Sequence, residues 1–190
     1  MTGRVPSILK RTTDVVGFAL MAAVVFQCPD SLALNRNAEP ICWEQTPTIR
    51  GTQGPDVIIG TDGPDVIQGL GGQDLIRGLR GDDFICGGLR KDRILGGLGD
   101  DHVQGDVGPD VIIGGKGVDT LKGNENADMI SGGRGNDLLV GGPASPDLLR
   151  GGNGDDELDG LDGLDDDVLN GGRKNDLCEA DAGDVVSNCP

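Results

Sequence analysis

The chain of 190 residues contains 35 glycines, 2% aromatic residues, and 16 basic against 32 acidic residues, which gives a net charge of -16. This length suits about one domain, and so few bulky side chains cannot fill an ordinary globular core. The acidity argues against nucleic acid and anionic membrane surfaces as partners and favours cations. The composition therefore indicates a thin repeat stack rather than a globule.

The first 33 residues have the organisation of a secretory signal peptide. Arg4, Lys10 and Arg11 precede an apolar run at residues 15–26, and Ser31 and Ala33 after it are small residues two apart. This run is shorter than the roughly 20 apolar residues of a membrane span. We expect cleavage after Ala33, export to a disulfide-permitting compartment, and no stable membrane insertion of the mature chain. An uncleaved anchor is the alternative.

Residues 51–179 form fourteen consecutive units, most of them nine residues long. Each nine-residue unit opens with Gly, carries Asp sixth, and nearly always carries an aliphatic residue eighth. The units at 141–150 and 160–170 contain ten and eleven residues, with the extra residues in the glycine-rich half. A fixed period over so many copies predicts a solenoid.

Alternation within each unit predicts which side chains form the core. The first six residues should make a glycine-rich turn, and the last three a very short strand whose central residue points inward. The residues on either side of the central one should face water. The central residues are Ile58, Ile67, Ile76, Ile85, Ile94, Val103, Ile112, Leu121, Ile130, Leu139, Leu149, Leu158, Leu169 and Cys178.

Two units per coil would stack the Asp residues in two columns, one layer apart. Layers about 4.8 Å apart bring like charges together, which costs about 1 kcal/mol per pair even in water. Calcium relieves this repulsion and accepts six to eight hard oxygen ligands, including backbone carbonyls. Magnesium demands stricter octahedral geometry, and zinc prefers Cys and His, of which the chain has a single His.

The units at 132–140 (GGRGNDLLV) and 151–159 (GGNGDDELD) match the pattern GGxGxDxUx at every specified position. The array thereby resembles the RTX (hemolysin-type) calcium-binding proteins. This resemblance implies an all-β fold, a right-handed parallel β-roll, with several Ca²⁺ ions held between successive turns by Asp carboxylates and turn carbonyls. The implied ligands are Asp56, Asp65, Asp74, Asp83, Asp92, Asp101, Asp110, Asp119, Asp128, Asp137, Asp147, Asp156, Asp167 and Asp176.

Several units depart from this pattern. The fourth position holds Arg90, Asn126 and Lys174 in place of Gly. Because a positive side chain inside a calcium loop would weaken or abolish the site, we expect fewer ions than the maximum.

The segments that flank the array are predicted to be caps. Residues 34–50 and 180–190 lie outside the period, and a stack must cover the apolar cross-section at each end. Trp43, the single Trp of the chain, is interpreted as a packed residue of the first cap.

Four cysteines remain after signal cleavage and allow three pairings. A bridge between Cys178 and Cys189 would hold the C-terminal tail over the open end, and similar closures end many secreted bacterial calcium-binding repeat proteins. Cys42 would then pair with Cys86 and fasten the first cap to the outer face, or both would stay free thiols.

No catalytic motif is present. His102 stands alone at an outward strand position and is interpreted as solvated. Paired carboxylates serve glycoside hydrolysis, but a catalytic pair needs two different environments, whereas all units here are alike. We therefore expect no enzymatic activity.

One of the two expected sheets has unusually apolar outward positions. A contiguous apolar stripe often marks an interface, so this sheet is expected to pack against the N-terminal segment, another copy, or a protein or cell-surface partner. Its residues are Val57, Ile59, Leu75, Leu95, Val111, Ile113, Met129 and Leu148.

Two functions follow from these observations. The first is an exported bacterial calcium-binding protein whose fold depends on the ion. The alternative is a cell-surface structural or adhesive module in which calcium only stiffens a rod that presents a binding face.

Overall fold

The computed structural model describes residues 42–143, 145–163 and 166–189, which belong to one compact unit, Glu39–Pro190. The expected signal peptide (1–33) and residues 34–41 of the expected N-terminal cap lie outside the described residues. The described part consists of strands and loops and contains no helix that could cross a membrane.

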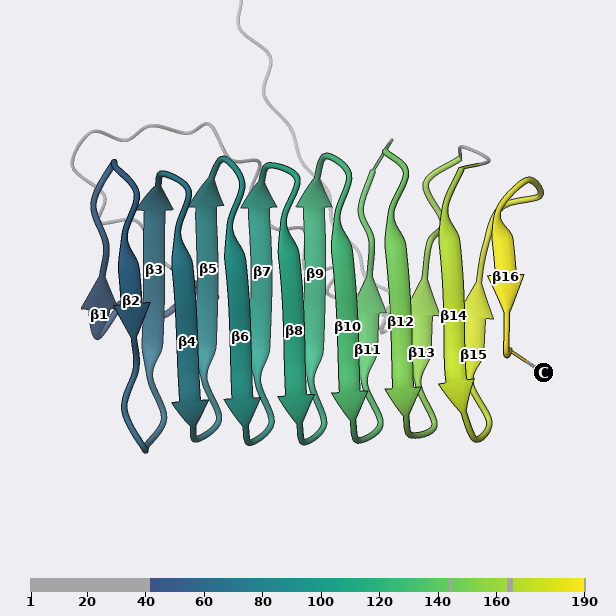
Figure 1. Cartoon of the computed structure of the whole chain (residues 1–190), viewed down its shortest axis with the longest axis horizontal. Coiled ribbons are helices and arrows are strands. Elements are labelled where there is room, and N and C mark those ends of the chain that lie inside the picture. The colour runs from purple at the N-terminus through teal and green to yellow at the C-terminus, as the bar shows by residue number, and fades with distance from the viewer. Residues whose placement is uncertain (1–41, 144, 164–165, 190) are drawn as a thin grey trace, which may run out of the picture. The chain divides into compact units, whose positions relative to one another are not determined.

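Sixteen strands form two parallel eight-stranded sheets in the described part of the chain (Figure 1). The odd sheet contains β1 (Ile49–Arg50), β3 (Val66–Gly71), β5 (Phe84–Leu89), β7 (His102–Val107), β9 (Thr120–Glu125), β11 (Leu138–Val140), β13 (Glu157–Asp159) and β15 (Leu177–Glu179). The even sheet contains β2 (Val57–Ile59), β4 (Leu75–Arg80), β6 (Arg93–Leu98), β8 (Val111–Lys116), β10 (Met129–Arg134), β12 (Leu148–Asn153), β14 (Val168–Arg173) and β16 (Val185–Ser187).

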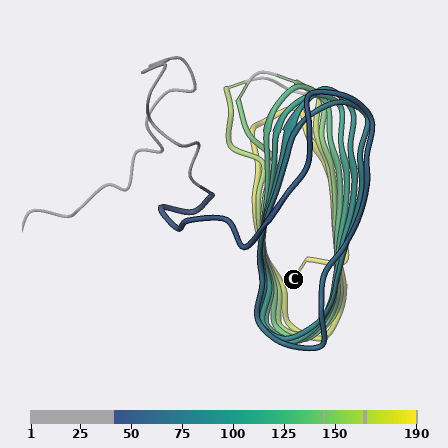
Figure 2. The same cartoon turned by 90° about the vertical axis from the view of Figure 1, so that its left-hand side faces the viewer.

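The chain alternates between the two sheets, so two units complete one coil, as the period predicts. Figure 2 shows these coils stacked one behind another along the axis. Equivalent positions pair in register: Ile76 with Ile94 in the even sheet, and Ile85 with Val103 in the odd sheet. The longer units keep this register, since Met129 pairs with Leu148 and the extra residues fall in the preceding loop. The expected all-β solenoid is therefore confirmed.

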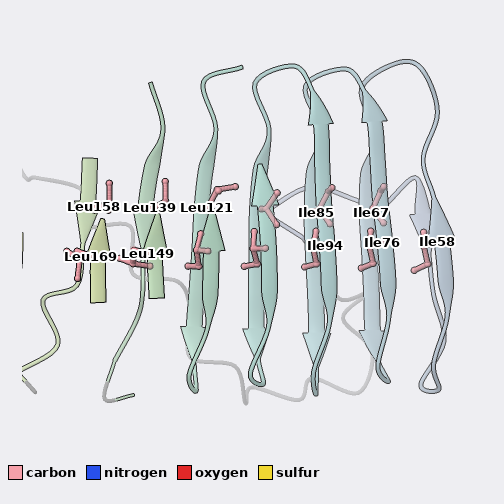
Figure 3. Packing of buried hydrophobic residues seen from close by; sticks show 13 residues of the cluster. Ile58, Ile67, Ile76, Ile85, Ile94, Leu121, Leu139, Leu149, Leu158 and Leu169 are labelled. Atoms are coloured by element: carbon pink, nitrogen blue, oxygen red, sulfur yellow. The ribbon is translucent and has the colours of Figure 1, made fainter. Parts of the chain in front are cut away.

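The core is one continuous cluster of aliphatic side chains between the sheets, arranged in two rows, one from each sheet (Figure 3). The thirteen aliphatic central residues from Ile58 to Leu169 are all buried, and Ile49 and Cys178 pack against the two ends. Each fully buried Leu, Ile or Val contributes about 1.5–3 kcal/mol through loss of apolar surface from water. The predicted core is confirmed.

The strands are longer than the sequence pattern predicts. Ten of them continue for six residues, through the first three positions of the next unit, as in Leu75–Arg80 of β4. The opening Gly is therefore an inward-facing strand residue rather than part of the turn. In β4 the burial alternates along the strand, and Ile76 and Gly78 are both buried. The turn proper is limited to the fourth to sixth positions.

A tight turn at Cys42–Gln45 lies on the outer face of the odd sheet. The Cys42 N–H donates to the Gln45 carbonyl at 3.2 Å, the reverse bond is 2.8 Å, and a disulfide joins Cys42 to Cys86. The Trp43 ring lies edge-on to His102 at 5.4 Å between ring centroids, and Lys122 Nζ lies 5.0 Å from the Trp43 centroid.

This turn corrects two expectations. His102 is not simply solvated, because it is partly buried between Trp43 and Phe84, whose ring centroid is 4.8 Å away. Val66 and Cys86 point outward yet are buried, since the turn covers them. Of the N-terminal segment, the turn at Cys42–Gln45 packs on the odd sheet, and residues 34–41 lie outside the described residues.

At the other end, residues 180–187 add a further coil segment that the sequence reading assigned to a cap. β16 pairs with β14 in parallel, with Val185 opposite Val168. Cys178 forms a disulfide with Cys189 just beyond this strand.

Candidate metal centre

The regular spacing of Asp within the units places the carboxylates at the two long edges of the roll. The upper edge, at the top of Figure 1, holds the turns that precede the even strands, and the lower edge holds those that precede the odd strands. The upper column contains Asp56, Asp74, Asp92, Asp110, Asp128, Asp147 and Asp167, and the lower column contains Asp65, Asp83, Asp101, Asp119, Asp137, Asp156 and Asp176. The structure thus aligns all fourteen predicted residues.

Each column is a ladder of hydrogen bonds between layers. The backbone N–H of Asp74 donates to Oδ1 of Asp92 at 2.8 Å, and that of Asp101 donates to Oδ1 of Asp119 at 2.9 Å. The same bond recurs along both columns at 2.7–3.0 Å. One oxygen of each carboxylate from Asp74 onward therefore supports the fold.

The other carboxylate oxygen has no such partner. In twelve Asp residues of the two columns Oδ2 is buried and accepts no hydrogen bond. The side chains are 0–5% exposed, so water does not solvate these oxygens freely. An unpaired buried carboxylate oxygen is costly, and a cation or a proton is needed to offset it. The twelve residues are Asp74, Asp83, Asp92, Asp101, Asp110, Asp119, Asp128, Asp137, Asp147, Asp156, Asp167 and Asp176.

The first two units differ because a threonine follows the opening Gly. Thr52 donates to Oδ2 of Asp56 from its backbone N–H at 2.6 Å and from Oγ1 at 2.9 Å. Thr61 makes the same two bonds to Asp65 at 2.6 and 3.0 Å. Here the protein itself supplies the donors that the later carboxylates lack.

Burial raises the pKa of most of these carboxyls above the ordinary value of 3.8. The N–H of the preceding layer opposes this shift, and neighbouring carboxylates add to it. The pKa is about 6 for Asp83, Asp119 and Asp167, about 7 for Asp92, Asp101, Asp128, Asp137 and Asp147, and about 8 for Asp110, and it is raised for Asp74 and Asp156. Protons therefore compete for the carboxyls of the metal-free stack between about pH 6 and pH 8.

The opening Gly is required by close approach to this carboxylate. A β-carbon at Gly69 would lie 2.7 Å from Oδ2 of Asp74, and one at Gly60 would lie 2.8 Å from Oδ2 of Asp65. Such contacts are closer than carbon and oxygen tolerate. The first position is Gly in all fourteen units for this reason.

The second and fourth positions often adopt left-handed backbone conformations. Gly115 has a φ of 129° and Gly117 a φ of 135°. A β-carbon at either would press on a carbonyl oxygen of the layer before it, at Gly97 or Gly99. Turn carbonyls therefore line the spaces between layers close to the carboxylates.

This oxygen set fits a hard cation such as calcium. The described residues contain no group of three or more His, Cys, Asp or Glu side chains that could hold a metal by themselves. Carbonyl oxygens would have to complete the coordination, as calcium allows and zinc does not. The unpaired Oδ2 atoms and the oxygen-lined spaces beside them are the features that fit the ion.

Comparison with known protein families agrees with this geometry. The model of the RTX calcium-binding nonapeptide repeat matches residues 50–85, 87–121, 104–139, 144–166 and 163–184, which together cover more than half of the chain. The chain belongs to this family and is a calcium-binding repeat protein. No curated protein is significantly similar to it.

One member of the ladder was missed from the sequence. The backbone N–H of Asp167 donates to Oδ1 of Asp184 at 3.0 Å, so Asp184 extends the upper column by one layer. The signal was present in residues 180–187 (ADAGDVVS), where Gly and Asp precede a β-branched pair. The absence of an opening Gly concealed it.

Proposed function

We propose that the chain is an exported calcium-binding protein whose β-roll folds when Ca²⁺ binds between its glycine-rich turns. The ligands in this proposal are sixth-position Asp carboxylates and turn carbonyls. The observation that carries it is the series of twelve buried Oδ2 atoms without a hydrogen-bond partner. Binding energy for these oxygens would then be part of the folding energy. The role is structural rather than catalytic.

The test is circular dichroism of the disulfide-bonded full chain at pH 7.5, titrated with calcium after removal of metal by a chelator. We expect a cooperative gain of β-sheet signal, with a midpoint between about 10⁻⁴ and 10⁻³ M, the range of extracellular calcium modules. Magnesium is the matched control and should have little effect at equal concentration. A chain that is equally folded in excess chelator would contradict the proposal.

Export is tested separately by the N-terminus of the protein recovered from the growth medium. A chain that begins at Leu34 supports cleavage after Ala33. A chain that is found only inside the cell with Met1 intact would rule export out.

A second function, display of a binding face at a cell surface, is favoured by the even sheet. Val57, Ile59 and Met129 are 72%, 56% and 51% exposed on its outer face. Val111, Met129 and Leu148 also line a shallow groove there. The double variant I113S/M129S should be released from the producing cell surface into the medium while it still folds in calcium. Equal surface retention of this variant and the parent chain would exclude the face as the contact.

A further inference from the structure

The charged side chains of the roll are divided unevenly between its two sheets. The eight strands of the even sheet contain seven Arg or Lys residues and no Asp or Glu. The eight strands of the odd sheet contain two basic residues and five acidic ones. The even sheet is therefore a basic surface on a chain whose net charge is -16.

The basic side chains occur in every even strand from β4 to β14, and all seven are exposed. Arg77, Arg93 and Arg150 each lie next to an inward-facing core residue, so their side chains point away from the outer face of the sheet. The other four end their strands, at the lower edge in Figure 1. The seven residues are Arg77, Arg80, Arg93, Lys116, Arg134, Arg150 and Arg173.

These cations have few partners within the roll. Among the described residues, Arg80 is the one member of the seven with an ion pair, to Asp62 at 3.8 Å, and both side chains of that pair are largely exposed. An exposed ion pair contributes little free energy, so it does not withhold Arg80 from another anion. The positive charge of the even sheet is thus available to a partner.

Aliphatic side chains lie between the cations on the same face. Leu75 pairs with Arg93, and Arg93 in turn pairs with Val111, so this guanidinium group has an apolar neighbour on each adjacent strand. Met129 and Arg150 both line the shallow groove of this sheet. The face therefore offers apolar contact and positive charge within the same small area.

A partner that satisfies both features must itself be anionic and apolar. Nucleic acids and acidic polysaccharides would meet the cations but would leave the exposed aliphatic side chains without apolar contact. The even strands also contain no aromatic residue on which bases or sugars would stack. An anionic lipid surface presents phosphate groups above acyl chains, so arginine can reach the phosphates while aliphatic side chains enter the boundary beneath them.

From this arrangement we infer that the even sheet docks on an anionic lipid surface, with the roll lying flat and no segment crossing the bilayer. The net charge does not prevent this contact. The acidic residues of the described array lie in the turns and on the odd sheet, and salt screens charges beyond about 8 Å. The inference rests on the second proposed function, because it names the class of partner for that binding face.

The first test is sedimentation of the folded full chain with lipid vesicles in calcium at pH 7.5. We expect binding to mixed phosphatidylcholine and phosphatidylglycerol vesicles, and binding at least about tenfold weaker to phosphatidylcholine alone. Equal binding to both kinds of vesicle, or binding to neither, would overturn the inference. Calcium-dependent folding would stand in either case, because circular dichroism measures it without lipid.

A matched pair of variants separates the face from the total charge. R93Q/R150Q removes two cations from the even sheet, and R90Q/K91Q removes two exposed cations from an upper-edge turn. R93Q/R150Q should bind mixed vesicles about thirty-fold more weakly, given the usual contribution of a basic residue near an anionic surface, whereas R90Q/K91Q should bind like the parent. Calcium that merely bridged the acidic turns to lipid phosphates would leave the two variants equal, and that result would overturn the inference.

The aliphatic part of the face is tested by I113S/M129S, which keeps every cation. This variant should also bind mixed vesicles more weakly than the parent while it folds equally well in calcium. Unchanged vesicle binding of I113S/M129S, or binding of the parent to heparin as tight as to mixed vesicles, would assign the face to a polyanion and exclude lipid. If I113S/M129S left the cell surface although the parent bound no vesicles, the second proposed function would hold with another partner.

Discussion

Two kinds of buried side chain run the length of this roll, and they have opposite energetics. The aliphatic cluster from Ile58 to Leu169 loses contact with water and stabilises the stack under all conditions. The Asp columns are as deeply buried, with Asp101 and Asp119 at 0% exposure, but their charge is unpaired. The aliphatic side chains stabilise the stack, whereas the Asp columns leave buried oxygens that an ion or a proton would satisfy.

The largest expected effect is the pH dependence of the metal-free chain. Burial holds the pKa of Asp92, Asp101 and Asp128 at about 7 and that of Asp110 at about 8, against 3.8 in the unfolded chain. The folded state then binds more protons than the unfolded state between these values, so stability is highest near pH 4 and falls as the pH rises towards 8.

In chelator, circular dichroism should show β structure near pH 5 that is lost by pH 8. The same chain in calcium should remain folded at pH 8. High salt is the control, because it screens surface repulsion but does not relieve buried charge. If the stability of the metal-free chain rose with pH instead, the claim that the buried Asp carboxylates oppose folding would be wrong.

The second effect concerns the aliphatic cluster alone. Ile112→Ala should cost about 2–5 kcal/mol, since it removes a fully buried side chain and leaves a cavity. The loss in thermal or denaturant unfolding should be similar in calcium and in chelator at pH 5, where both forms are folded. A loss of unfolding free energy that is seen only in calcium would mean that the aliphatic core and the metal sites do not contribute independently to stability.

The smallest effect concerns the layer in which the protein supplies its own donors. Thr61→Val removes the hydroxyl that donates to Oδ2 of Asp65 at 3.0 Å and keeps the backbone donor. The same hydroxyl also accepts the N–H of Gly63 at 3.2 Å, so we expect a loss of about 1–2 kcal/mol, the net value of two hydrogen bonds. Thr46→Val, outside the repeats, is the control. No change in unfolding free energy for Thr61→Val would show that this carboxylate is satisfied without the hydroxyl.

Much of this architecture could be predicted because each unit sees the same neighbours. Alternation around Ile76 or Leu139 gives the inward direction, and the two-unit coil follows from a turn every nine residues. The residues of both Asp columns followed from the same period. The length of the strands could not be predicted from the period. Gly78 and its equivalents look like turn residues in the sequence, and they are strand residues in the structure because they face the Asp carboxylate.

The sequence by itself determined the period, the aliphatic core and the stacked carboxylates, because all of these depend on local and nearest-layer contacts that repeat. Only the tertiary structure decided that the Cys42–Gln45 turn covers the odd sheet and that His102 packs against Trp43 and Phe84. These contacts involve segments that occur once, so no repetition in the sequence could specify them.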